Sequence, residues 1–365
     1  MPETGRVGWP GVLAAAASRG RPLLAESISW PEADGSQDVI DDLGAVCGDA
    51  VVLDVSAGRG DLPRLCDAVR AIGRPVAVRA AVGDARIAVE MAVAAGTGCY
   101  QFSVFDFLAT ADVSGRLWRV QEADRLAQMT AAGSGPVVRW CSPSSGAGAC
   151  PVALSAACTL LDALLAREQG VTDLIISHAV TGSLAQDVAT LHALRQLTRQ
   201  WLGPGEPIRV WLAATQWHRR LPPDRGEAFG LAMAGTTIAC VGAVDIIETL
   251  PVSGGPGSGY AETAGPNVRA TQQMINLLAG QSLAVDAALL TVAETVRASA
   301  TAIIEHAHVL GEGNLARGVA RLVGQGLLED LRGDTAVRSS DGVLLFPHEP
   351  SAPLPAAVLP GLTAG

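Results

Sequence analysis

The chain has 365 residues, of which 49% are hydrophobic and 17% charged, so it can bury a large core and is not intrinsically disordered. Its formal charge of −10 argues against nucleic acid as a partner, because phosphate binding requires a basic face. All 26 basic residues are arginine, which excludes chemistry that depends on a lysine, such as Schiff-base formation or a P-loop lysine.

Short apolar runs alternate with longer helical patterns along the chain, and this alternation predicts eight strand–helix pairs in series. The expected strands read as continuous apolar runs, which is typical of strands buried on both faces of a parallel sheet. The expected strands are 23–28, 50–56, 75–81, 99–105, 136–141, 173–179, 208–214 and 243–250.

The intervening segments predict helices, and nothing long separates the pairs, which favours a closed α/β structure, a (β/α)8 TIM barrel, over an open doubly wound sheet. Among the expected helices are 62–72, 84–95, 116–132, 151–167, 183–202 and 225–240.

After the eighth strand, the glycine-rich stretch 253–259 lacks the strand-to-helix setting of a phosphate-binding loop and is interpreted as a flexible connection. Further helices are expected near 263–278, 285–310 and 314–328. The predicted organisation is an N-terminal segment (1–20), the barrel (21–280), a helical C-terminal appendage (281–346) and a loosely ordered Pro/Ala-rich tail (347–365).

Two long uncharged stretches, 140–161 and 228–244, are interrupted by glycine and by proline or threonine, so neither predicts a membrane-spanning helix. The apolar patch 9–18 contains Pro10 and follows Glu3, which makes a poor signal peptide. The seven irregularly spaced cysteines predict free thiols in a reducing compartment, and no metal-ligand spacing is present. These features predict a cytoplasmic protein without a bound metal.

In parallel barrels the active site lies at the carboxyl ends of the strands, and this rule selects candidate residues without further information. Three arginines around one opening would suit a carboxylate substrate, because each guanidinium can bind two oxygens. A structural alternative stays open for each candidate: a solvated arginine, a hydrogen-bonded histidine, a packed tryptophan or a capping glutamate. The candidates are Arg59, Arg79, Gln101, Arg139, His178, Gln216, Trp217 and Glu248.

Six blocks of the sequence resemble, in the same order and spacing, the large chain of glutamate mutase, also called the methylaspartate mutase epsilon subunit. The resemblance covers roughly residues 20 to 345. The blocks are Val78–Gly96, Leu164–Val171, Gln186–Leu194, Gln216–Gly230, Arg269–Leu278 and Gly311–Gly326.

This resemblance implies a barrel that works with adenosylcobalamin and isomerises glutamate to 3-methylaspartate by a radical rearrangement of the carbon skeleton. It also implies a separate small chain that binds the cobalamin through Asp-x-His-x-x-Gly, a motif that none of the six histidines here occupies. The barrel would exclude water and hold the substrate still.

The resemblance also assigns substrate contacts. Of three family arginines that bind the substrate carboxylates, Arg79 matches one, Arg59 matches a second through a gap, and the third has no counterpart near Glu26. An arginine after strand five is retained as Arg139. The family glutamate expected to handle the substrate amine corresponds to Gln101, which cannot accept a proton at neutral pH.

For the cofactor, the resemblance places Gln216 and Trp217 in a family His-Gln-Trp motif. A family Lys-Ser/Thr-Pro-His-Glu motif that touches the adenosyl ribose corresponds to the stretch from Glu248 to Ser253, which has no lysine and carries a serine near the place of the glutamate. We therefore expect cofactor contacts from Gln216, Trp217, Glu248 and Ser253.

Three functions remain open from the sequence. The first is a cobalamin-dependent mutase acting on glutamate or on an altered amino or carboxylic acid. The second is an inactive barrel that serves as a scaffold for the cobalamin-binding chain. The third, a cofactor-free lyase, is less favoured, because the chain has neither a lysine nor a metal-ligand cluster.

Overall fold

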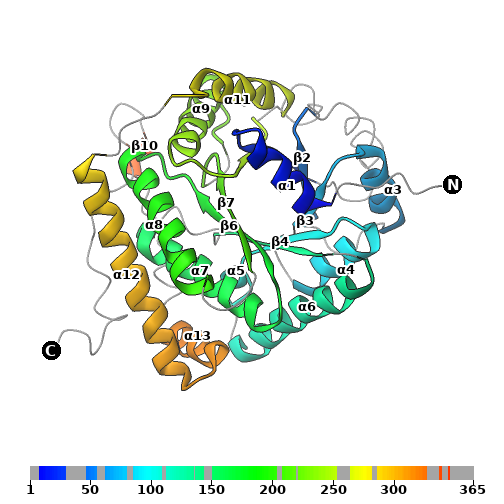
Figure 1. The fold of residues 1–365 in the computed structure, drawn as a ribbon, viewed down its shortest axis with the longest axis vertical. Helices are drawn as coiled ribbons and strands as arrows, with labels where there is room; N and C mark the ends of the chain where they lie inside the picture. Colours follow the sequence, from blue (N-terminus) through cyan, green and yellow to red (C-terminus); the bar gives the residue numbers. More distant parts are fainter. Residues whose placement is uncertain are drawn as a thin grey trace.

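The computed structural model describes residues 8–29, 47–55, 62–79, 85–108, 112–134, 136–143, 150–203, 208–218, 221–252, 264–281 and 286–326, with the short segments 337–338 and 344–345. Eight parallel strands pair in sequence order and close into a barrel through pairing of the first with the last (Figure 1). The strands are β1 (Leu23–Ser29), β2 (Ala50–Asp54), β3 (Val76–Arg79), β4 (Cys99–Phe102), β5 (Val138–Cys141), β6 (Asp173–Ala179), β7 (Arg209–Thr215) and β8 (Ile246–Thr249).

Helices surround this barrel and pack their apolar residues against the outer face of the sheet. The predicted TIM barrel is confirmed. The helices of the barrel are α3 (Leu62–Ile72), α4 (Ala85–Ala95), α5 (Val104–Phe107), α6 (Val113–Ser134), α7 (Val152–Glu168), α8 (Leu184–Leu202), α9 (Arg225–Val241) and α11 (Gly265–Leu278).

The expected fourth strand, 99–105, is too long. The strand ends at Phe102, because its ladder partner on β5 ends at Cys141, and the remaining apolar residues form the single helical turn α5. An apolar run alone does not distinguish a buried strand from a buried helical turn.

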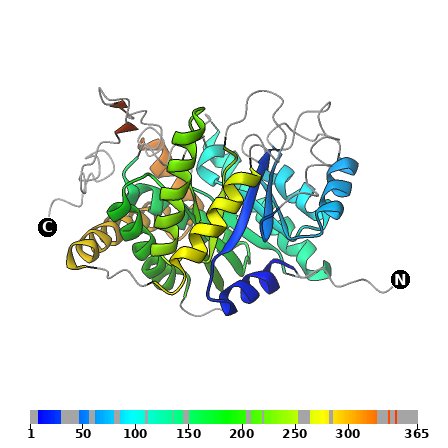
Figure 2. The ribbon, with the colours of Figure 1, turned by 90° about the horizontal axis from the view of Figure 1, so that it is seen from above.

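The N-terminal patch forms a helix, α1 (Trp9–Ser18), which the sequence analysis did not predict. Pro10 lies in its first turn, where a missing backbone N–H costs nothing. Figure 2 shows α1 across the amino ends of the strands. Trp9 is buried there, donates its indole N–H to the Val76 carbonyl at 2.9 Å and meets Trp140 edge to face at 5.9 Å. The helix therefore closes the amino end of the barrel.

The barrel interior at this end is apolar and combines small with large side chains. Small inward residues such as Ala25, Ala50 and Ala77 leave room for the two indole rings of Trp9 and Trp140, which is how interiors reach close packing. Because side chains alternate between the two faces of a strand, this inward set fixes the face of every other strand residue.

Two helices follow the barrel, as predicted: α12 (Ala287–Gly311) and α13 (Leu315–Gly324). The helix α12 packs against α7, α8 and α13. By length and composition alone, α12 is apolar enough to span a membrane, and about a quarter of that window is buried in the fold. The two-residue strands β9 (Val337–Arg338) and β10 (Leu344–Leu345) pair antiparallel within the segment predicted as helical. The boundaries of the appendage stay a prediction, and the tail 347–365 lies outside the described residues.

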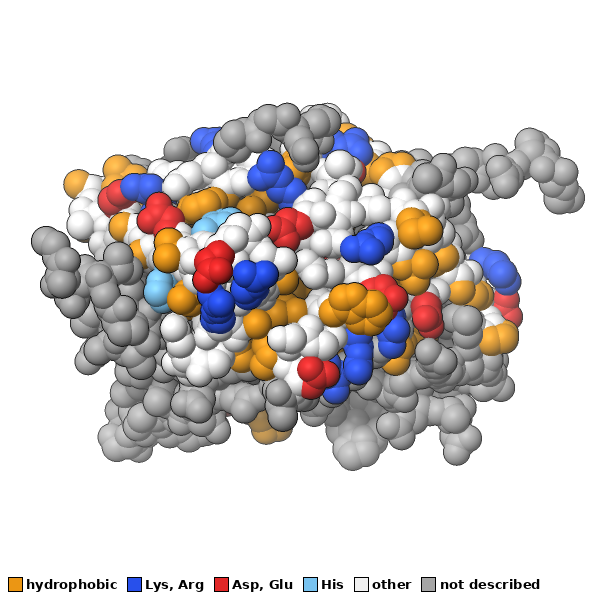
Figure 3. All heavy atoms as spheres, turned by 90° about the horizontal axis from the view of Figure 1, so that it is seen from below, with side chains coloured by type: hydrophobic (Ala, Val, Ile, Leu, Met, Phe, Trp, Pro, Cys, Tyr) orange, Lys and Arg blue, Asp and Glu red, His pale blue; other side chains and the backbone are white. Residues whose placement is uncertain are grey.

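All seven cysteines are free thiols, four of them buried and Cys47 exposed. On the face shown in Figure 3, basic, acidic and hydrophobic side chains are interspersed. Surface charges pair locally, as in the contact between Arg86 and Glu122 at 3.2 Å, and such exposed pairs contribute little to stability.

Candidate functional site

At the carboxyl end of the barrel, the inward positions change from apolar to polar on all eight strands. Each polar residue lies two positions after an apolar inward residue, for example Gln101 after Cys99 and Glu248 after Ile246, so the period of two places it on the inner face. We call these eight residues the mouth ring. Its members are Ser27, Asp54, Arg79, Gln101, Ser142, Ser177, Thr215 and Glu248.

Arg79 is the only cation in the mouth ring and is bonded on several sides. Its Nη2 forms an ion pair with Glu248 Oε1 across the opening, and its Nε donates to Gln101 Oε1 at 3.2 Å. Its Nη1 lies 4.0 Å from Asp54 Oδ2 on the neighbouring strand. Burial lowers the pKa of the Arg79 guanidinium and the charge of Asp54 raises it, and a guanidinium stays protonated in either case.

Gln101 holds Arg79 in place. Its oxygen accepts from Arg79, so its amide nitrogen donates, and Ser142 Oγ receives that hydrogen bond at 2.7 Å. Gln101 is buried and is the register partner of Arg79 on β3. The amide thus fixes the side of the guanidinium that faces β4, and it offers no basic group.

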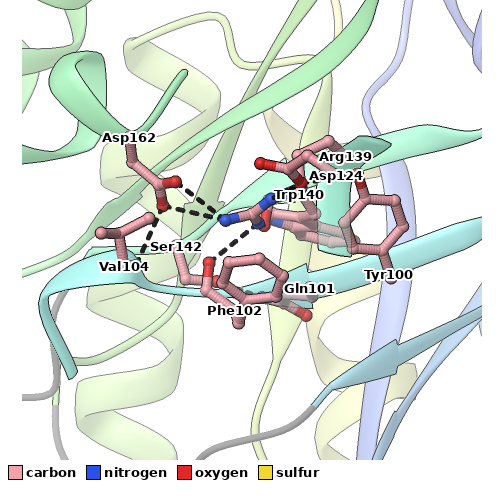
Figure 4. A network of polar contacts seen from close by, with 9 residues as sticks. All are labelled: Tyr100, Gln101, Phe102, Val104, Asp124, Arg139, Trp140, Ser142 and Asp162. Carbon is pink, nitrogen blue, oxygen red and sulfur yellow. Dashed lines mark hydrogen bonds and ion pairs between the residues drawn. The ribbon is translucent and has the colours of Figure 1, made fainter. Parts of the chain in front are cut away.

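Arg139 does not lie at the mouth. It stands between the inward residues Val138 and Trp140, so its side chain points outward into the layer between the sheet and the helices. Figure 4 shows its guanidinium directed at Asp162 on α7, with contacts of 2.8 and 3.1 Å. Its Nε also lies 3.3 Å from Asp124 on α6. The expected convergence of Arg79 and Arg139 is therefore wrong.

Aromatic side chains complete the surroundings of Arg139. Its guanidinium carbon lies 3.4 Å from the centre of the Phe102 ring, and Tyr100 donates to Asp124 at 2.7 Å. Burial raises the pKa of Asp162 to about 7, although the charge of Arg139 lowers it. Because Arg139 is fully buried and committed to these partners, it joins the strands to α6 and α7.

His178 also points away from the barrel interior, because its neighbour Ser177 points inward. Its Nε2 lies 2.9 Å from Asp187 Oδ1 at the start of α8. The same carboxylate accepts from the backbone N–H groups of Thr181 and Gly182. His178 therefore ties β6 to the first turn of α8, as in the structural alternative for this residue.

Gln216 and Trp217 follow β7 and belong to the protein interior. The Gln216 amide donates to Thr236 and Thr271 at 2.9 and 2.7 Å, and its oxygen accepts from Asn267 at 2.7 Å. Trp217 is buried in an apolar cluster with Leu221, Ala228, Ala232 and Val252. A Cβ added to Gly182 would lie 3.0 Å from its ring, so the indole packs directly under that loop.

Of the residues expected to contact the cofactor, Glu248 alone among those described belongs to the mouth ring. It is 1% exposed, and its second oxygen accepts from the Thr215 hydroxyl at 2.9 Å. Ser253 and Arg59 lie outside the described residues. Among the residues expected to contact the cofactor, the described ones thus bring one carboxylate to the mouth ring, and it is already paired with Arg79.

The sequence analysis missed five members of the mouth ring. A signal for them was present: each lies two residues beyond an inward apolar residue at a strand end, and this spacing can be read once the strand and its inner face are known. The missed residues are Ser27, Asp54, Ser142, Ser177 and Thr215.

A closed eight-stranded barrel with a polar ring at its carboxyl end defines a TIM-barrel protein with a candidate small-molecule site there. The sequence matches the family model of the methylaspartate mutase E chain (MutE) over residues 62–331, which is most of the chain. The chain therefore belongs to this family, and its predicted relation to the large subunit of glutamate mutase is confirmed.

Curated relatives agree with this membership. The chain is 28% identical to the glutamate mutase epsilon subunit of Yersinia enterocolitica, over 71% of this chain and 55% of that protein. It is 26% identical to that of Escherichia coli O157:H7, over 78% and 62%. For Treponema denticola the identity is 28% over 49% and 37%. The chain thus matches less than two thirds of the length of these relatives.

Among solved structures, the dihydropteroate synthase of Yersinia pestis superposes with a TM-score of 0.44 at 11% identity, covering 71% of this chain and 91% of that chain. This likeness is too weak to carry an argument. The barrel assignment rests on the strand order of this chain itself.

Proposed function

We propose that this chain is the barrel subunit of an adenosylcobalamin-dependent carbon-skeleton mutase of the glutamate-to-3-methylaspartate type, acting on an amino or carboxylic acid. A separate small chain would hold the cobalamin, in a cytoplasmic heteromer. Family membership supports the reaction class, and the mouth ring around Arg79 is the observation in this chain that carries the proposal. When bound, adenosylcobalamin supplies the radical that starts such a rearrangement.

In this proposal the residues of the chain bind and orient the substrate. Arg79 binds a carboxylate oxygen of the substrate, since it is the cation of the mouth ring and its side chain is still one fifth exposed. Gln101 and Glu248 prevent the guanidinium from turning away. Arg59 is proposed as a further substrate contact, following its match to the family pattern.

The barrel also excludes water. Its amino end is closed by α1 and its interior is apolar up to the mouth ring, so a substrate at the carboxyl end has no solvent behind it. Water exclusion protects a reactive intermediate from side reactions and strengthens the polar contacts of the mouth.

The proposal is tested by reconstitution. The full chain is mixed with a small cobalamin-binding subunit and adenosylcobalamin, and a panel of amino and carboxylic acids is followed by NMR. We expect a rearranged acid that depends on both additions, and a loss of kcat/KM of at least about 100-fold in Arg79→Met. If no acid is rearranged with both components present, the mutase assignment is wrong.

One observation favours a second function. The single cation of the mouth ring is paired with Glu248, and Gln101 replaces an ionisable group in the family pattern, as expected for a barrel that has become a scaffold for the cobalamin-binding chain. Saturable binding of that chain without turnover, unchanged by Arg79→Met, would support the scaffold over the mutase.

A further inference from the structure

Three serines stand side by side on neighbouring strands at the carboxyl end of the barrel. The last register pairs of β5 join Cys141 to Phe102 on β4 and to Ile176 on β6, so the residues that follow these three stand at one level. The backbone N–H of Ser142 donates to the Phe102 carbonyl at 3.3 Å and continues the ladder to this level. We call the three residues of this level the serine row, and they are Ser103, Ser142 and Ser177.

The side chains of the serine row point into the barrel. Ser142 and Ser177 are members of the mouth ring. Ser103 has an extended backbone and lies two residues after the inward Gln101, so the period of two turns it inward as well. Neighbouring strands lie ~4.8 Å apart, so an oxygen atom between two adjacent hydroxyls can lie within hydrogen-bond reach of both. The row is therefore spaced to hold a group that carries oxygen.

The hydroxyls of the serine row lack acceptors in the part of the chain that the structure describes. Ser103 is 4% and Ser177 1% exposed, and neither Oγ has a hydrogen-bond partner. Ser142 Oγ accepts from the Gln101 amide at 2.7 Å, which leaves its own proton to give, and it donates to none of the described residues. Because buried polar groups are nearly always hydrogen-bonded, these hydroxyls point to a group supplied from outside the chain.

The level below the serine row indicates which kind of group is missing. Two residues earlier on the same strands, Gln101, Trp140 and Ile175 are register partners, and the Trp140 Nε1 is also buried without a partner. An indole N–H only donates, and Ser142 has only its proton left, so both lack an acceptor. A carboxylate or carbonyl oxygen is such an acceptor. The positive charge of Arg79, which is bonded to Gln101, also favours an oxygen that carries negative charge.

We infer that the serine row is a second substrate subsite, which binds a carboxylate or carbonyl oxygen at the far end of a substrate whose first carboxylate is bound at Arg79. The inference rests on the proposed function in that it takes the carboxyl end of the barrel to be the substrate site. The mouth then recognises one group by charge and the other by hydrogen bonds from hydroxyls. Ser103 and Ser177 are the specificity-determining residues of this subsite.

Calorimetric titration of the full chain with three acids of one chain length tests this inference. Glutarate has a carboxylate at both ends, 5-amino-5-oxopentanoate has a neutral amide carbonyl at one end, and pentanoate has a methyl group there. We expect the first two to bind at least about 10-fold more tightly than pentanoate, because a methyl group leaves the buried hydroxyls without an acceptor. The ranking of the first two then distinguishes a carboxylate from a neutral carbonyl as the preferred group.

Two single variants assign the preference to the serine row. Ser103→Ala and Ser177→Ala should each reduce the preference for 5-amino-5-oxopentanoate over pentanoate by about 3- to 10-fold and leave the Kd of pentanoate unchanged. In the ligand-free chain the free energy of unfolding should stay the same or rise, because each variant removes a buried hydroxyl that has no partner. The control is Ser155→Ala on α7, at a serine that is 5% exposed and lies outside the barrel interior, and it should leave both preferences unchanged.

Equal binding of pentanoate and the two other acids would overturn the inference, as would no detectable binding of those two at millimolar concentration. Preferences unchanged in both serine variants would overturn it too, because the row would then hold ordered water only. A fall in stability with unchanged preferences would show that the hydroxyls are structural. These titrations contain neither cobalamin nor a partner chain. A failed reconstitution therefore contradicts the mutase and leaves the binding preference standing, whereas turnover with unchanged preferences contradicts the serine row alone.

Discussion

Arg79 and Arg139 are the same residue type on strands of the same barrel, each beside two carboxylates, yet they belong to different regions. Arg139 is fully buried between the sheet and the helices, with Asp124 and Asp162 from two helices around it. Arg79 lies inside the barrel at the mouth, one fifth exposed, and its carboxylates come from strands. The first arginine holds elements together, and the second keeps part of its side chain exposed at the mouth.

The difference arises because side chains alternate between the two faces of a strand, and the two arginines occupy opposite faces. Arg79 is two residues after the inward Ala77, whereas Arg139 follows the inward Val138 directly. His178 and Gln216 share the outward parity of Arg139, and both are hydrogen-bonded to helices. A polar residue near a strand end is thus a candidate for the mouth when its parity is inward and a connector to the helices when it is outward.

The largest expected effect separates the two arginines by stability. Arg139→Leu leaves Asp124 and Asp162 buried without their cation, so we expect the free energy of unfolding to fall by about 3–5 kcal/mol in urea denaturation. The exposed pair of Arg297 with Glu294 provides a control, since Arg297→Leu should cost less than about 1 kcal/mol. Equal small losses in both variants would contradict the structural role of Arg139.

Arg79→Met is the counterpart at the mouth. Glu248 loses its cation but keeps the Thr215 hydroxyl, so we expect a loss of about 1–3 kcal/mol in unfolding free energy, smaller than at Arg139. Addition of Glu248→Gln should restore part of this stability, because the unpaired charge is removed. In both variants the kcat/KM of the reconstituted protein should fall by at least about 100-fold. Loss of turnover without loss of the fold is the expected signature of a mouth residue.

The strands and most helices could be predicted because buried parallel strands and barrel helices leave continuous signals of 4 to 22 residues in this chain. The sides of the strands could not be assigned from the same signal, since an apolar run on a strand buried on both faces has no visible alternation. The helix α1 with Trp9 was missed for another reason: it is stabilised by contacts with Trp140 and Val76, which are remote in sequence.

The pH dependence of the unfolding free energy tests the carboxylates around Arg139. Burial raises the pKa of Asp162 to about 7, whereas its ordinary value is near 4. Between these values the folded protein retains a proton that the unfolded chain has released, so this group lowers stability as pH rises from about 4 to about 7 and has no further effect above.

The expected slope from Asp162 is at most about 1.4 kcal/mol per pH unit, and Asp162→Asn should remove it while its amide oxygen still accepts from Arg139. Urea denaturation of both proteins at several pH values between 4 and 8 measures this difference. Identical slopes in the two proteins would show that Asp162 is ionised throughout and that the two carboxylates share Arg139 without a proton.

The smallest expected effect concerns Gln101, which bonds Arg79 without a charge of its own. Gln101→Ala removes the hydrogen bonds to Arg79 and Ser142 but leaves the ion pair with Glu248. We expect a loss of about 0.5–1.5 kcal/mol in unfolding free energy and a loss of about 3- to 10-fold in the kcat/KM of the reconstituted protein. Gln281→Ala removes an exposed amide that donates to the Leu277 carbonyl at the end of α11, and it should change neither turnover nor stability measurably. If Gln101→Ala turns over as fast as the wild type, the ion pair with Glu248 alone positions Arg79, and the amide has only a packing role. A loss of kcat/KM as large as in Arg79→Met would instead mean that Gln101 contacts the substrate directly.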